Sequence, residues 1–153
     1  MEYFLIVFVI FLALAPLTHF IPSKRQRLVA RLRETAAVSG LFVEYRSPPE
    51  KGKRQHKGGA LIYYGKRLPN TRGASIERMA WLRDDWGWRG LDKPADTPEV
   101  LPTLPEEIII ATVDEGSCGV YWDEDGGEEV LVEICRVLEA WSDQLRPQKS
   151  DFA

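Results

Sequence analysis

Seven acidic side chains in the last third of the chain are the residues best suited, by type and spacing, to do chemistry. They are Asp114, Glu115, Asp123, Glu124, Asp125, Glu128 and Glu129. Carboxylate oxygens are the ligands that hard cations such as Ca²⁺ prefer, so an enzyme with a metal at this cluster is one interpretation. The spacing matches no EF-hand loop, and the helix dipole stabilises acidic residues at a helix start without any metal. We therefore predict a solvated cluster and no metal ligands.

The sequence does not combine the side chains that nucleophilic catalysis requires. Cys118 and Cys135 form no Cys-x-x-Cys pair, and neither has a histidine close by in the sequence. His19 falls in an apolar stretch and His56 in a basic one, so neither is placed to act as a general base. We predict two small buried cysteines, no catalytic residues, no cofactor and no enzymatic activity.

Charge is divided unevenly along the chain, although the formal net charge is −3. Residues 22–72 hold 13 basic and 3 acidic side chains, whereas residues 73–153 hold 7 basic and 19 acidic ones. A strongly basic segment indicates an anionic partner. The candidate contact residues are Lys24, Arg25, Arg27, Arg31 and Arg33 in one group, and Lys51, Lys53, Arg54 and Lys57 in a second. We expect the first group to meet anionic headgroups, each contributing about 1 kcal/mol, and keep lipid or nucleic-acid binding by the second as an alternative.

Two tryptophans form a further candidate contact. Trp86 and Trp88 stand two residues apart beside glycines, flanked by Arg83 and Arg89. Aromatic rings interleaved with guanidinium groups can stack on a partner, whereas tryptophans more often fill the core of a small domain. Both interpretations stay open at this point.

The first element that must position these residues is an apolar stretch at the N-terminus. Residues 3–21 carry no formal charge, and as a helix they would span about 28 Å, close to the thickness of the hydrocarbon core of a bilayer. Pro16 is expected to kink this helix. A signal peptide would carry Lys or Arg before its apolar core, and here only Glu2 precedes it. The five basic residues that follow predict an uncleaved anchor, with the N-terminus outside and the rest of the chain in the cytoplasm.

Residues 24–38 are predicted to form a basic helix, because Ser23 and Gln26 match a capping box and Gly40 can end the helix. Strands are predicted at 41–46, 60–64, 74–84, 108–113 and 118–122, and a helix stays the alternative at 74–84. Residues 47–59 are expected to form a flexible basic loop. Four prolines between positions 94 and 105 predict an extended arm that lays Leu101 and Leu104 on the domain surface.

The last predicted element is an amphipathic helix, with Asp125 as N-cap and Glu128 as its capping-box partner. Its apolar positions are Val130, Ile134, Val137, Leu138, Trp141 and Leu145. Such a face must cover an apolar surface, and the sheet provides one. The predicted fold is α+β: a transmembrane anchor at 1–22, a juxtamembrane helix at 23–39, a mostly antiparallel sheet of about five strands under the C-terminal helix at 40–146, and a tail at 147–153.

Three stretches together carry a resemblance: the apolar anchor with the basic residues 22–33, the segment Asp-Trp-Gly-Trp-Arg-Gly at 85–90, and residues 120–124. The layout resembles a proteobacterial family of small single-pass inner-membrane proteins. Over about the first 35 residues it is also similar in anchor and orientation to YajC-type translocase accessory subunits. The resemblance implies no particular activity. We therefore expect a membrane-tethered, non-catalytic module that interacts with a membrane-protein partner, as an accessory subunit of an inner-membrane complex does.

Overall fold

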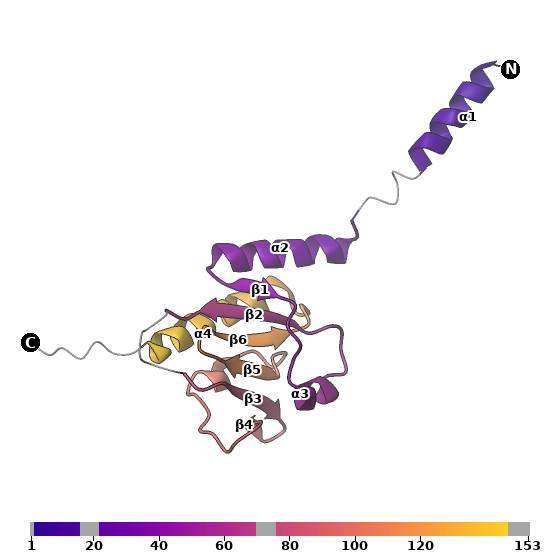
Figure 1. Ribbon diagram of the computed structural model, residues 1–153. Coiled ribbons are helices and arrows are strands. Elements are labelled where there is room, and N and C mark those ends of the chain that lie inside the picture. The colour runs from indigo at the N-terminus through magenta and orange to yellow at the C-terminus, as the bar shows by residue number, and fades with distance from the viewer. Residues whose placement is uncertain (1, 16–21, 70–75, 147–153) are drawn as a thin grey trace, which may run out of the picture. The chain divides into compact units, whose positions relative to one another are not determined.

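The computed structural model describes residues 2–15, 22–69 and 76–146 and divides the chain into two compact units, Met1–Arg31 and Leu32–Ala153 (Figure 1). The first unit contains helix α1 (Glu2–Leu14), whose large apolar side chains are exposed on every side of the helix. Among the described residues, no helix is both long enough and apolar enough to cross a membrane. Residues 16–21, which complete the predicted anchor, lie outside the described residues.

Helix α2 (Lys24–Val38) begins and ends where the sequence predicts. The backbone N–H of Ser23 donates to Oε1 of Gln26 at 2.8 Å, and the N–H of Gln26 donates to Oγ of Ser23 at 3.2 Å. These two hydrogen bonds confirm the predicted capping box. Gly40 follows the helix with a left-handed φ of 76°, a conformation that glycine adopts without a steric penalty.

The second unit is built on one antiparallel sheet of six strands in the order β1-β2-β6-β5-β3-β4. The strands are β1 (Phe42–Glu44), β2 (Ile62–Arg67), β3 (Met79–Asp84), β4 (Gly87–Gly90), β5 (Ile110–Val113) and β6 (Ser117–Trp122). All five predicted strands are confirmed, and the ambiguous stretch at 74–84 contains strand β3. The additional strand, β4, has two glycines in four residues, so its sequence carries no strand pattern.

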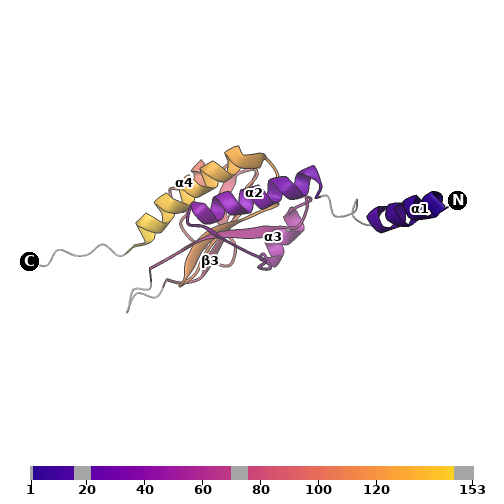
Figure 2. The same cartoon turned by 90° about the horizontal axis from the view of Figure 1, so that it is seen from above.

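Helix α4 (Gly127–Leu145) lies across one face of the sheet, which confirms the predicted amphipathic helix (Figure 2). Its buried face carries the predicted residues Val130, Ile134, Val137, Leu138 and Trp141, with Leu145 packed at the edge. Leu32 and Ala36, from the second half of α2, lie in the same core. Burial of an apolar side chain of this size stabilises the fold by about 1.5–3 kcal/mol, so this layer holds the sheet in place.

The opposite face of the sheet carries a smaller apolar cluster that includes Leu82 and Ile110. Helix α3 (Glu50–Gln55) packs on this cluster through Gly52, where an added Cβ would lie 2.4 Å from Cδ1 of Ile110. The prediction of a flexible loop at 47–59 is therefore wrong for this segment. The missing glycine side chain lets the helix backbone rest directly on the sheet, and a run of lysines and glycines gives no sign of that.

The predicted N-cap of α4 is also wrong. Gly126, with φ at 98°, occupies the N-cap position, and no side chain caps the helix. The carbonyl oxygen of Asp125 instead accepts a hydrogen bond from the indole N–H of Trp122 at 2.7 Å. Since the ring of Trp122 is fully buried, this bond fixes the chain just before the helix.

The proline-rich arm differs from its prediction as well. It contains the 3₁₀ turn η2 (Leu101–Thr103), and both Leu101 and Leu104 are buried in the main core. Arg83 on β3 fastens the arm to the sheet, because its guanidinium donates hydrogen bonds to the carbonyl oxygens of Leu104 and Pro105. The prediction that these leucines lie on the domain surface is therefore wrong.

Candidate functional site

The acidic cluster that the sequence singles out is divided among separate sites. Asp114 pairs with Arg46, Glu124 pairs with Arg33, and Asp123 lies 3.6 Å from His56. Glu128 and Glu129 occupy the first turn of α4, where the helix dipole favours them. Within residues 2–15, 22–69 and 76–146, no group of three or more His, Cys, Asp or Glu side chains could hold a metal ion.

The two cysteines are free thiols in different surroundings. Cys118 on β6 is fully buried, as predicted, and this burial raises the pKa of its thiol to about 12. Cys135 on α4 is half-buried, and burial raises the pKa of its thiol as well. Reactive cysteines have a lowered pKa and an accessible sulfur, and Cys118 has neither property.

The five residues of the first basic group lie in different surroundings. Lys24, Arg25, Arg27 and Arg31 are exposed on α2. The fifth residue, Arg33, forms a two-point ion pair with Glu124. The Arg33 guanidinium is therefore bound to another side chain of the same domain.

The second basic group is also divided. Lys51 donates to the carbonyl oxygen of Leu91 at 2.8 Å, and Lys57 is exposed. The side chains of Lys53 and Arg54 lie outside the described residues.

The two candidate tryptophans differ in their exposure to solvent. Trp86 forms the turn between β3 and β4 and is 97% exposed. Trp88 is half-buried, and the guanidinium of Arg83 lies 5.1 Å from the centre of its ring. The core interpretation thus holds for Trp81, Trp122 and Trp141, which are buried, and the contact interpretation stays open for Trp86.

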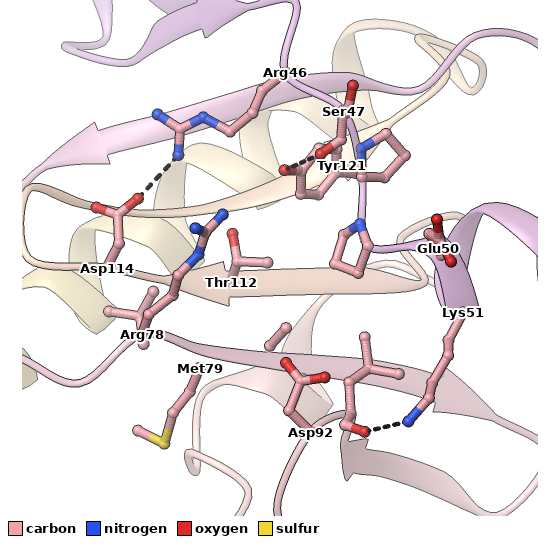
Figure 3. A pocket seen from close by; sticks show the side chains of 15 residues that line it. Arg46, Ser47, Glu50, Lys51, Arg78, Met79, Asp92, Thr112, Asp114 and Tyr121 are labelled. Carbon is pink, nitrogen blue, oxygen red and sulfur yellow. Dashed lines mark hydrogen bonds and ion pairs between the residues drawn. The ribbon is translucent and has the colours of Figure 1, made fainter.

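A cavity lies on the face of the sheet opposite α4. This cavity has a volume of about 620 Å³. Residues 46–51 form one wall, strands β3, β5 and β6 contribute the floor, and Leu91 and Asp92 close a further side (Figure 3). Cavities of this size commonly hold small ligands.

A row of small residues crosses the sheet and ends at this cavity. Gly65 on β2, Gly119 on β6, Thr112 on β5 and Ala80 on β3 stand opposite one another in register. The ring of Tyr63 lies over the two glycines, since a Cβ added at Gly119 would come within 2.5 Å of that ring. Thr112 and Ala80, further along the same row, line the cavity.

Arg46 forms the polar wall beside Tyr63. Its guanidinium lies 4.4 Å from the ring centre of Tyr63 and donates to Asp114 at 2.9 Å and to Glu44 at 3.0 Å. Although burial opposes it, the N–H groups of Gly116 and Ser117, the Ser117 hydroxyl and Arg46 together hold the pKa of Asp114 below its usual value. Arg46 and Asp114 therefore neutralise each other.

Two more side chains point into the cavity. The hydroxyl of Tyr121 donates to the carbonyl oxygen of Ser47 at 3.3 Å, and burial raises the pKa of Tyr121 to about 12, so it stays neutral near pH 7. Arg78 is exposed and directs its guanidinium into the cavity (Figure 3). Among the described residues it forms no ion pair. The arrangement offers a cation without an ion-pair partner among the described residues, beside a floor of apolar and hydroxyl-bearing side chains, which is suited to binding.

Sequence reasoning missed every residue of this cavity except Asp114 and Lys51. Arg46, Arg78, Thr112 and Tyr121 come from separate strands and their flanking segments, so no spacing in the sequence connects them. The one local signal is Gly119, a glycine within a buried strand, which commonly marks a close approach of other atoms.

No protein-family model, no curated protein and no solved structure matches this chain. The resemblance drawn from its layout therefore stays a prediction.

Proposed function

We propose that this protein is a membrane-tethered, non-catalytic interaction module. The observation that carries the proposal is the surface of α1. Large apolar residues from Tyr3 to Leu14 are each at least half exposed, and they cover every side of the helix. Transfer of such a side chain out of water contributes about 1.5–3 kcal/mol, so the helix gains a large free energy from insertion into lipid. We propose that residues 3–21 together make this insertion.

The side of the membrane on which the domain lies is inferred from the basic residues that follow the apolar stretch. Lys24, Arg25, Arg27 and Arg31 are exposed just after the apolar stretch, and basic residues at this place are retained in the cytoplasm. They also suit contact with anionic headgroups. We propose a single pass through the inner membrane, with the N-terminus outside and the domain in the cytoplasm.

A membrane-protein partner would complete this function, and Trp86 is the side chain best placed to meet one. A fully exposed tryptophan at the tip of a hairpin can bury a large apolar area and is a frequent anchor of protein interfaces. The alternative of lipid or nucleic-acid binding through residues 51–57 has less support, because Lys51 is bonded to the carbonyl of Leu91 within the domain.

Membrane fractionation tests the tether. The wild-type chain should stay in the membrane pellet after an alkaline carbonate wash. The variant Val7→Arg/Phe11→Arg should be released, since each central arginine costs about 2.5–3.5 kcal/mol in a membrane helix. The matched control is Val38→Arg, which changes an even more exposed valine at the end of α2 and should remain in the pellet. A wild-type chain found in the supernatant would refute the proposal.

A second experiment tests the partner. Cross-linking in membranes followed by purification in a mild detergent should give a defined complex, which Trp86→Ala weakens. The control, Val132→Ala, changes an exposed apolar residue of α4 and should leave the complex intact. If the chain stays monomeric under cross-linking, the interaction part of the proposal is wrong while the tether can still stand.

A further inference from the structure

We propose that the cavity on the open face of the sheet binds a small organic monocarboxylate, with Arg78 as the residue that holds the carboxylate. The inference goes beyond the proposed tether and does not depend on it, because every residue that it uses belongs to the unit Leu32–Ala153.

Arg78 is the cation of the cavity that is left to bind a ligand. Three cationic side chains line the cavity. Arg46 is neutralised by Asp114 and Glu44, and Lys51 is bonded to the carbonyl of Leu91. Arg78 forms no ion pair with any residue in the described ranges and points into the cavity beside the strand that carries Thr112 (Figure 3). A guanidinium presents planar paired donors, which match a carboxylate in two-point contact.

The rest of the cavity restricts the class of anion. Glu50 and Asp92 are exposed carboxylates that also line it, and they repel a ligand with several negative charges. A nucleic acid or a phosphate dianion is therefore disfavoured relative to a monoanion. The floor near Ala80 and Met79 is apolar, and the volume of about 620 Å³ leaves room for an organic body behind the carboxylate.

Titration of the full chain in non-ionic detergent tests this inference by ligand-observed NMR. The probes are benzoate, its neutral isostere benzamide, and inorganic phosphate. Benzoate should bind saturably, and the other two should bind at least about tenfold more weakly. Equal binding of benzamide would show that charge plays no part, and equal binding of phosphate would refute selectivity for a monoanion. Absence of saturable benzoate binding would overturn the inference.

Two variants locate the site. Arg78→Gln should weaken benzoate binding by about 10- to 100-fold, the usual cost of a lost charge-assisted pair. The control Arg136→Gln removes an exposed arginine of α4 that pairs with Glu133 on the same helix, and it should change nothing. Ala80→Leu should also abolish binding by filling the floor while keeping all charges, with circular dichroism to verify the fold. Equal affinities of wild type, Arg78→Gln and Ala80→Leu would refute the assigned site.

Discussion

Arg33 of α2 and Glu124, which lies between β6 and α4, form a two-point ion pair, with Nε–Oε1 at 2.7 Å and Nη2–Oε2 at 2.9 Å. The Glu124 side chain is 7% exposed, and its carboxylate also accepts a hydrogen bond from the Tyr64 hydroxyl at 2.8 Å. Glu124 has a φ of 61°, an unfavourable conformation for a residue other than glycine. Its neighbours therefore hold this residue in place, and Arg33 is the charged one among them.

Removal of the Arg33 charge should destabilise the domain. Arg33→Leu leaves the Glu124 carboxylate buried without its cation, and we expect the free energy of unfolding to fall by about 1.5–3 kcal/mol. Urea denaturation of the full chain in non-ionic detergent measures the change. Arg136→Leu breaks an exposed pair with Glu133 and should cost less than about 0.5 kcal/mol. Similar losses for the two variants would contradict the structural role of the buried pair.

The packing of α4 on the sheet gives a second prediction. Leu138 is fully buried, so Leu138→Asp places an unpaired charge in the core and should abolish the thermal unfolding transition of the domain. Val132 lies on the same helix and is 58% exposed, so Val132→Asp should keep the transition nearly unchanged. Near-ultraviolet circular dichroism follows both variants. A normal transition for Leu138→Asp would show that α4 does not pack as described.

The elements with a clear local signal were predictable from the sequence. The capping box of α2, the apolar stripe of α4 and the strand runs each follow from the types of neighbouring residues. The errors arise where tertiary contacts decide. Gly52 lets α3 pack on Ile110, and Leu101 enters the core because Arg83 fastens the proline-rich arm. The cavity could not be predicted, because its floor depends on the register that places Thr112 opposite Ala80 and Gly119.

Thiol labelling should separate the two cysteines. With its pKa raised to about 12 by burial, Cys118 is ionised to about one part in ten thousand at pH 8, and its sulfur is inaccessible. Cys135 is half-buried and should react slowly in the folded chain. Mass spectrometry after maleimide treatment should therefore find label on Cys135 first, and on both residues at similar rates in denaturant. Rapid labelling of Cys118 in the folded chain would show that β6 opens readily.

The lowered pKa of Asp114 predicts how the stability of the domain depends on pH. The folded-state pKa of Asp114 is lowered by hydrogen bonds from Gly116 and Ser117 and by Arg46. A lowered pKa contributes stability that is fully present above the unfolded value, near 4, and is lost as the pH falls through the folded value. Asp114→Asn should thus be less stable than the wild type at pH 6, and the difference should shrink below about pH 4.

The matched control for this pH dependence is Asp143→Asn. Asp143 pairs with Arg146 across a contact in which both side chains are more than half exposed. We expect no difference in unfolding free energy from the wild type beyond about 0.5 kcal/mol at either pH. A gap between wild type and Asp114→Asn that persists unchanged at pH 3 would contradict the assignment to the carboxylate charge.

Strand β6, next to the strand that carries Thr112, gives the last prediction. In Gly119→Ala the new Cβ would lie 2.5 Å from both the Tyr63 ring and the backbone oxygen of Tyr64, and a backbone atom within a sheet cannot easily move aside. We expect a loss of about 1–3 kcal/mol in urea denaturation, as for other overpacked cores. In Gly59→Ala the added Cβ meets nothing within 4 Å, so that variant should be near neutral. If Gly119→Ala is as stable as Gly59→Ala, the Tyr63 ring does not lie against β6, and the register that places Thr112 on the cavity floor must be revised.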